Sequence, residues 1–78
     1  MVLVTTKNCN NCDIAKTNLE TIGVIPETKN FSKLEKDERS KIRSFLVENN
    51  ATLPILMISG TIVSGVNNIL NTAMSVVM

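Results

Sequence analysis

The sequence predicts a small α/β fold in which four strands form one mixed sheet and three helices pack against it. Short segments rich in β-branched residues alternate with longer amphipathic segments, which favours a parallel strand–helix–strand unit near the start. A tight turn at Ser59-Gly60 joins two apolar segments and predicts an antiparallel hairpin. With 78 residues, the chain has room for one domain, which we expect to span residues 1–78.

The first two elements are a strand and a helix. Residues 2–6 form a short segment that is rich in β-branched residues, as is typical of strands. A helix then follows a Cys-x-x-Cys motif and runs to about Ile22, where Gly23 stands in the position of a helix-ending glycine. Its apolar residues recur at helical spacing and form one face: Cys12, Ala15, Leu19 and Ile22.

A second strand and a second helix come next. Residues 24–31 predict the strand, with Pro26 placing at least its start at an edge or outside the hydrogen-bonded ladder. Ser32 and Glu35 form a capping box, which predicts the start of a helix that runs to about Asn49. The expected buried stripe of this helix is Leu34, Ile42, Phe45 and Leu46.

The last part of the chain predicts the hairpin and a third helix. Residues 55–58 and 61–63 form its two strands, and the helix covers roughly residues 66–77. Its apolar face is Val66, Ile69, Leu70, Ala73, Met74 and Val77. The predicted order is therefore strand–helix–strand–helix–strand–strand–helix.

Composition excludes several classes of function. The net charge of +1 and the presence of only two aromatic residues argue against a nucleic-acid-binding protein. The absence of histidine excludes imidazole catalysis. The stretch from Asn49 to Met78 is uncharged, but Pro54, Gly60 and Gly65 interrupt it before it reaches the length of a membrane span. The first residues lack the features of a signal peptide, so we expect a cytoplasmic protein.

The Cys-x-x-Cys motif is the strongest functional signal. Cys9 precedes the first helix, where unpaired N–H groups and the helix dipole favour an anion, and Lys7 adds a nearby cation. Both features should lower the pKa of Cys9 and make it a nucleophilic thiolate. Cys12 lies one turn further along, within reach of a disulfide to Cys9. The same motif also binds metals, although two cysteines supply only half of a tetrahedral ligand set.

The segment Thr52-Leu53-Pro54 stands immediately before a strand that should be internal. A proline there lacks the N–H that the ladder needs, and a cis Leu53–Pro54 bond would explain it by allowing a sharp turn. Such a turn would bring the backbone of Leu53 beside Cys9, where an extended substrate could pair with it. An ordinary trans turn proline is the alternative.

Taken together, these motifs resemble the thioredoxin-fold superfamily, and most closely the glutaredoxins. The resemblance covers essentially the whole chain. Glutaredoxins typically show Lys-x-Cys-Pro-Tyr-Cys, then Thr-Val-Pro, then Gly-Gly-x-Asp-Asp. Here residues 7–12 read Lys-Asn-Cys-Asn-Asn-Cys, residues 52–54 read Thr-Leu-Pro, and residues 64–68 read Ser-Gly-Val-Asn-Asn. The predicted fold is therefore thioredoxin-like.

The resemblance implies a dithiol–disulfide oxidoreductase that uses glutathione. Cys9 would be the residue that is glutathionylated, and Cys12 the one that releases glutathione. Lys7 would assist catalysis and contact the glycine carboxylate of glutathione, while Leu53 would pair with its backbone. The full set of implied glutathione-binding residues is Lys7, Asn11, Thr52, Leu53, Pro54, Gly65, Val66, Asn67 and Asn68. No metal is expected.

Three departures from the glutaredoxin pattern leave alternatives open. Asn10-Asn11 replaces Pro-Tyr, Ser64-Gly65 replaces the paired glycines, and Asn67-Asn68 replaces an acidic pair that would face the ammonium of glutathione. The chain is also similar to short redoxins that serve ribonucleotide reductase and are recharged by thioredoxin reductase. A copper-chaperone-like metal carrier and an iron–sulfur-binding module remain alternatives of another class.

The implied partners are glutathione, disulfide-containing proteins with ribonucleotide reductase as one candidate, and a flavin reductase acting directly or indirectly. Neither nucleic acid nor a membrane is an expected partner, and we expect a monomer.

Overall fold

A computed structural model describes residues 1–77 of the chain. The predicted domain ends at Met78, which lies outside the described residues. The elements follow in the predicted order of strands and helices, with one short 3₁₀ helix, η1, before the second α-helix. They are β1 (Val2–Thr5), α1 (Asn10–Thr21), β2 (Glu27–Asn30), η1 (Phe31–Lys33), α2 (Lys36–Glu48), β3 (Ile55–Ile58), β4 (Thr61–Ser64) and α3 (Val66–Val77).

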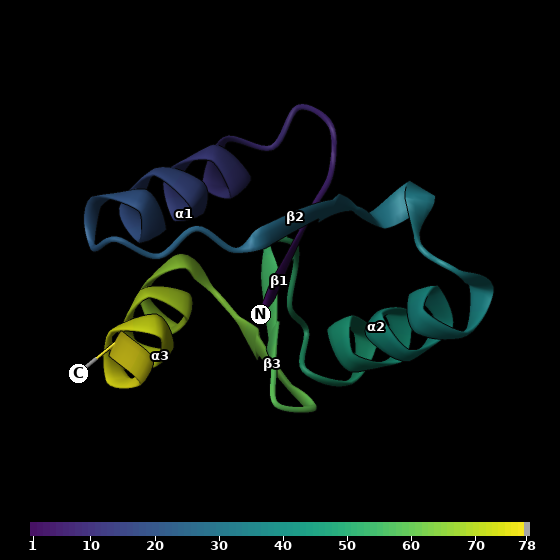
Figure 1. The fold of residues 1–78 in the computed structure, drawn as a ribbon. Coiled ribbons are helices and arrows are strands. Elements are labelled where there is room, and N and C mark those ends of the chain that lie inside the picture. Colours follow the sequence, from purple (N-terminus) through teal and green to yellow (C-terminus); the bar gives the residue numbers. More distant parts are fainter. Residues whose placement is uncertain (78) are drawn as a thin grey trace.

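The four strands form one mixed sheet in the order β2-β1-β3-β4. Strands β1 and β2 are parallel, with Thr5 opposite Asn30, and β3 runs antiparallel to both β1 and β4. Figure 1 shows β1 in the middle of this arrangement. The prediction of a four-stranded mixed sheet with three helices in a thioredoxin-like fold is confirmed.

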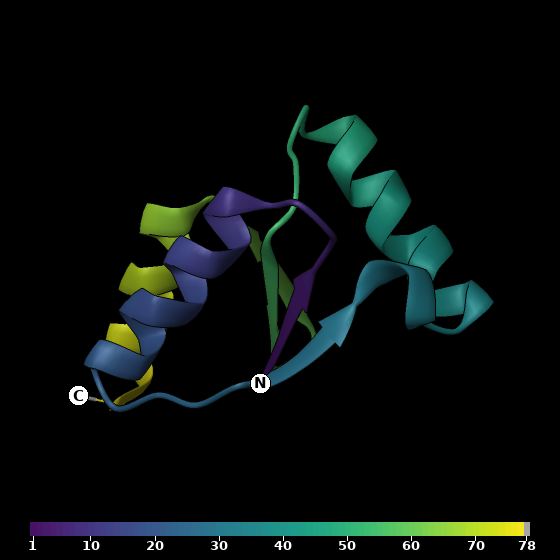
Figure 2. The ribbon, with the colours of Figure 1, turned by 90° about the horizontal axis from the view of Figure 1, so that it is seen from above.

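The helices cover both faces of the sheet. Figure 2 shows α1 and α3 side by side on one face and α2 alone on the other. Alternation along the strands explains this arrangement, because successive side chains point to opposite faces. Leu3 and Leu56 pack under α1 and α3, whereas Val4 and Ile55 pack under α2. The site described below lies at one end of the two central strands, after β1 and before β3.

Helices α1 and α2 end in the same backbone motif. After α1, Gly23 adopts a positive φ of 83°, and the N–H of Val24 donates to the carbonyl of Leu19 at 2.8 Å. After α2, Asn50 adopts a positive φ of 48°, and the N–H of Ala51 donates to the carbonyl of Leu46 at 2.8 Å. Glycine and asparagine tolerate this left-handed conformation, so the chain reverses without leaving the last carbonyls unpaired.

The capping box predicted at Ser32 and Glu35 is wrong. Ser32 lies inside η1, and its N–H and hydroxyl both donate to the side-chain oxygen of Asn30, at 3.0 and 2.8 Å. The helix begins only at Lys36, and Glu35 makes no side-chain capping bond. Asn30 therefore caps the short 3₁₀ helix. Ser32 lies inside η1 and cannot also act as the N-cap of α2.

The second strand is shorter than the predicted residues 24–31. Only Glu27–Asn30 pair with β1, while Val24 and Pro26 are buried in the connection before the ladder begins. This position of Pro26 agrees with its lack of an N–H donor.

Helix α3 matches the predicted range and presents most of the predicted apolar face to the sheet. Ile69 and Ala73 are fully buried, and Val66 packs against the same cluster. Met74 was predicted in the core but is 38% exposed. The side chain of Val77 lies outside what the structure describes. Within residues 1–77, every helix is too short or too polar to cross a membrane.

Candidate active site

Cys9 and Cys12 are joined by a disulfide at the start of α1, with their Cα atoms 5.2 Å apart. The two sulfurs differ in accessibility because Cys9 precedes the helix and Cys12 lies on its inner face. Cys9 is half-buried, whereas Cys12 is only 3% exposed. Of the two residues, Cys9 is therefore the one that an external thiol or disulfide can approach.

Cys9 is also the N-cap residue of α1. Its backbone is extended, and its Sγ accepts a hydrogen bond from the backbone N–H of Cys12 at 3.1 Å. Serine and threonine oxygens usually occupy this position, where they satisfy an unpaired N–H of the first turn. Here a sulfur does so. The same N–H and the positive end of the helix dipole would stabilise a thiolate at Cys9 after reduction.

The segment before β3 lies against this sulfur. The Leu53–Pro54 peptide bond is cis, and the carbonyl oxygen of Leu53 lies 3.9 Å from the Sγ of Cys9. Pro54 is buried, whereas Leu53 packs half-buried against the cluster under α2. The structure thus brings together two segments that are 44 residues apart in the sequence.

A shallow polar groove of about 320 Å³ lies along the same segment. It is walled by the start of α1, the loop from α2 to β3, and the start of α3. Seven of the predicted glutathione-binding residues line it: Asn11, Thr52, Leu53, Pro54, Gly65, Val66 and Asn68. Their binding role stays a prediction, but the fold gathers them into one groove from three distant parts of the chain. Cys9 itself does not line the groove, and Leu53 connects the two through the 3.9 Å approach of its carbonyl oxygen to the Cys9 sulfur.

Two predicted residues lie outside this groove. Lys7 is exposed in the turn between β1 and α1, and no acidic group within residues 1–77 lies within 4.0 Å of its ammonium. Asn67 is exposed in the first turn of α3 and does not line the groove, unlike its neighbour Asn68.

Four lining residues were not predicted: Asn49, Asn50, Ala51 and Ser64. The first three form the turn that follows α2, and the left-handed conformation of Asn50 directs the chain past the groove. A sequence signal existed for this turn, because asparagine is the usual substitute for glycine just after a helix. That signal locates the turn, but it does not reveal that the turn borders a groove.

The groove is polar but carries no charged side chain. Four asparagines line it, and hydrogen bonds orient two of them. The side-chain N–H of Asn49 donates to the carbonyl of Phe45 at 2.9 Å. The side-chain N–H of Asn68 donates to the carbonyl of Ser64 at 3.1 Å, which leaves the amide oxygen of Asn68 to accept a hydrogen bond. Gly65, just before α3, adopts a positive φ of 89° and adds no side chain to the groove wall.

Within residues 1–77, no group of three or more His, Cys, Asp or Glu side chains is placed to hold a metal ion. The chain matches no protein-family model, and no curated protein matches it. Functional assignment therefore depends on the geometry of the cysteine pair and the groove.

Proposed function

We propose that the protein is a glutaredoxin-like thiol–disulfide oxidoreductase with Cys9 as nucleophile and Cys12 as resolving residue. The observation that carries this proposal is the unequal burial of a disulfide at a helix N-terminus. The half-buried Cys9 can react with a substrate, and the buried Cys12 is protected until the first reaction has occurred. A purely structural disulfide between residues only three apart would stabilise the fold little, because it closes a very short loop.

The proposed reaction transfers two electrons from the dithiol to a substrate disulfide. The Cys9 thiolate attacks one substrate sulfur, forms a mixed disulfide and releases the other sulfur as a thiolate. The Cys12 thiolate then attacks the sulfur of Cys9, which releases the second substrate thiolate and closes the Cys9–Cys12 bridge. The N–H of Cys12 that donates to Cys9 Sγ would stabilise the Cys9 thiolate before it attacks.

Glutathione is the proposed reductant and co-substrate. Two glutathione thiolates would reopen the bridge in two exchange steps and leave as glutathione disulfide. The groove beside Cys9 supports this choice, because its wall near Leu53 offers a carbonyl to an extended peptide and Asn68 offers an amide oxygen to an ammonium group. The first N–H groups of α3 would face a carboxylate. The proposed compartment is the cytoplasm, where dithiols are kept reduced.

A second candidate follows from the charge of the groove. Glutathione carries two carboxylates and one ammonium, yet no charged side chain lines the groove. The backbone of an internal protein segment around a cysteine carries no charge. Such a segment could bind in the same groove without charged side chains to pair with it. The alternative is therefore a redoxin that reduces a protein such as ribonucleotide reductase and is recharged directly by a flavin reductase.

The order of elements weighs against the metal-carrier alternative. Copper-chaperone-like domains run strand–helix–strand–strand–helix–strand, whereas this chain ends its described part in a helix after a hairpin. An exposed cation, Lys7, also stands two residues before the first cysteine, where it would repel a metal ion.

Reduction of a small glutathione mixed disulfide tests the proposal. The full chain is supplied with either glutathione and glutathione reductase or thioredoxin reductase as the electron source, and NADPH consumption is followed. We expect turnover with glutathione. Turnover with thioredoxin reductase alone would instead assign the redoxin function.

The matched control is Cys9→Ser, in which the hydroxyl can still cap α1 and keep the fold. Its turnover should fall to the background of the uncatalysed reaction. Failure of the folded wild-type chain with both electron sources would refute the oxidoreductase assignment.

A further inference from the structure

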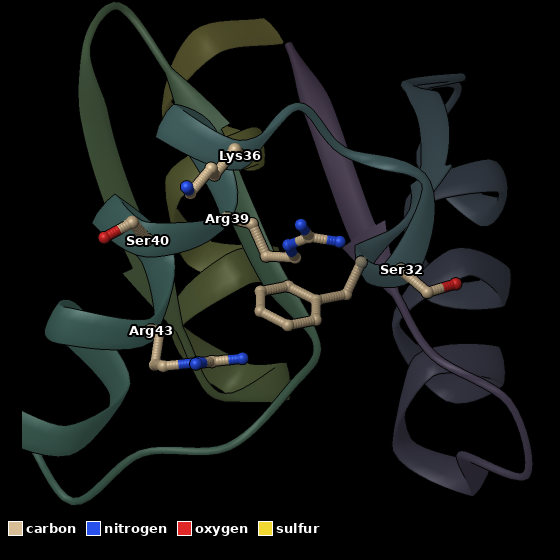
Figure 3. A pocket seen from close by; sticks show the side chains of 6 residues that line it. Ser32, Lys36, Arg39, Ser40 and Arg43 are labelled. Carbon is tan, nitrogen blue, oxygen red and sulfur yellow. The ribbon is translucent and has the colours of Figure 1, made fainter.

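A second cavity, of about 450 Å³, lies between η1 and α2, on the other side of the sheet from α1. Its lining is basic: Phe31, Ser32, Lys36, Arg39, Ser40 and Arg43. The four residues from α2 fall at helical spacing on one face of that helix, so the fold itself gathers the three cations. Figure 3 shows the guanidinium groups of Arg39 and Arg43 extending from α2 toward the η1 side of the cavity.

This concentration of charge is unusual for the chain as a whole. Three cationic side chains share one cavity in a protein whose net charge is +1. The acidic residues nearest in sequence are Glu35, Asp37 and Glu38, and in the described part of the chain none of them lies within 4.0 Å of the charged groups of Lys36, Arg39 or Arg43. Within residues 1–77, the one ion pair is Lys29 with Glu27 at 3.9 Å, and it involves none of the residues that line this cavity.

Like charges at this spacing repel one another, and Lys36 adds a cation at the positive end of the α2 dipole. A bound anion would offset the repulsion between the cations and the unfavourable interaction of Lys36 with the helix dipole. Among the described contacts, Lys36, Arg39 and Arg43 make no side-chain hydrogen bond, so their donors are available to a ligand.

We propose that this cavity binds an anionic ligand that carries at least two phosphate groups. Guanidinium groups match phosphate oxygens with two parallel hydrogen bonds, and an ammonium group adds a point charge. The Ser40 hydroxyl supplies a further donor, whereas the hydroxyl of Ser32 already donates to Asn30 and only shapes the wall. The cavity volume lies in the range of small-molecule sites, which favours a compact ligand over an extended acidic peptide.

Two kinds of ligand carry two or more linked phosphate groups, namely an inorganic polyphosphate and a nucleotide. Phe31 gives the cavity an aromatic wall on which a base could stack. The two are distinguished by titrating the oxidised full chain with pyrophosphate and with ADP. Binding is measured from the backbone amide chemical shifts in NMR spectra. We expect both ligands to move the signals of residues 31–43. Tighter binding of ADP would assign a nucleotide, and equal binding would assign the phosphates alone.

Charge-matched variants separate a specific site from general attraction. Arg39→Gln and Arg43→Gln should each weaken pyrophosphate binding about ten-fold, because each removes a charged hydrogen-bonding partner. Lys41→Gln removes the same charge from the same helix but does not line the cavity, and it should weaken binding less than about two-fold. Arg43 is exposed, so its substitution leaves the core intact.

Three results would overturn the proposal. One is the absence of localised shifts with either ligand at low ionic strength. Another is equal weakening by Lys41→Gln and Arg43→Gln. The third is binding of an acidic peptide at residues 31–43 in the absence of binding by pyrophosphate and ADP. Because these measurements involve no electron transfer, they do not depend on the proposed oxidoreductase activity.

Discussion

The backbone N–H of Cys12 donates a 3.1 Å hydrogen bond to the sulfur of Cys9. The two cysteines are therefore linked by a backbone contact as well as by the disulfide. This contact places the reactive sulfur at the cap of α1, and it connects the local structure of the helix to the chemistry expected of the motif.

The two cysteines should have unequal roles when each is replaced by serine. Cys9→Ser should abolish all turnover, because it removes the accessible nucleophile. Cys12→Ser should keep the reduction of glutathione mixed disulfides, which needs only one thiol, and lose the reduction of protein disulfides. Steady-state assays with both substrate types check this, and full activity of Cys9→Ser would refute the assignment.

Lys7 should favour the thiolate form of Cys9 through its positive charge. In Lys7→Met, we expect the pH profile of Cys9 alkylation by iodoacetamide to move to higher pH, because the anion loses a nearby cation. Lys16→Met is the matched control, since Lys16 is an exposed cation further along α1. An unchanged profile in Lys7→Met would remove Lys7 from the mechanism.

The neutral groove should limit the affinity for glutathione. In Asn68→Asp, a carboxylate replaces the amide that lines the groove, and a charge-assisted contact with the ammonium of glutathione would be stronger. We expect KM for a glutathione mixed disulfide to fall several-fold with kcat little changed. Asn71→Asp adds the same charge to the exposed side of α3 as a control. Equal effects of the two variants would place the ammonium elsewhere.

The packing of α3 on the sheet should dominate the stability of this small domain. Ile69 is fully buried among Leu3 and Leu56, so Ile69→Ala should lower the free energy of unfolding by about 2–5 kcal/mol. Val76→Ala, at a residue of the same helix that is 58% exposed, should change it by less than about 0.5 kcal/mol. Urea unfolding of the oxidised protein measures both.

The sequence predicted those features of the fold that local conformation decides. Ser59 and Gly60 both adopt positive φ, of 49° and 78°, as the two-residue hairpin requires. Gly23 ends α1 where its left-handed conformation was expected. The alternation of apolar residues in the strands explains why both faces of the sheet are covered.

Features that depend on competition between neighbouring residues could not be predicted in the same way. Ser32 could cap α2 or belong to η1. It belongs to η1 because its N–H and its hydroxyl both donate to the side-chain oxygen of Asn30. The groove wall at residues 49–51 depends on where α2 ends relative to β3, which is a matter of tertiary packing. The basic cavity likewise forms only once η1 and α2 are placed side by side, which is again a matter of tertiary packing.

The burial of Cys12 has a consequence for the order of kinetic events. Because only the sulfur of Cys9 can be reached from outside, the incoming reductant and the outgoing substrate must use the same atom. The two cannot react with one molecule of the protein at the same time. If the proposed activity holds, the protein would alternate between oxidised and reduced forms in a ping-pong cycle. An excess of the reductant or of the substrate would then compete with the other for Cys9.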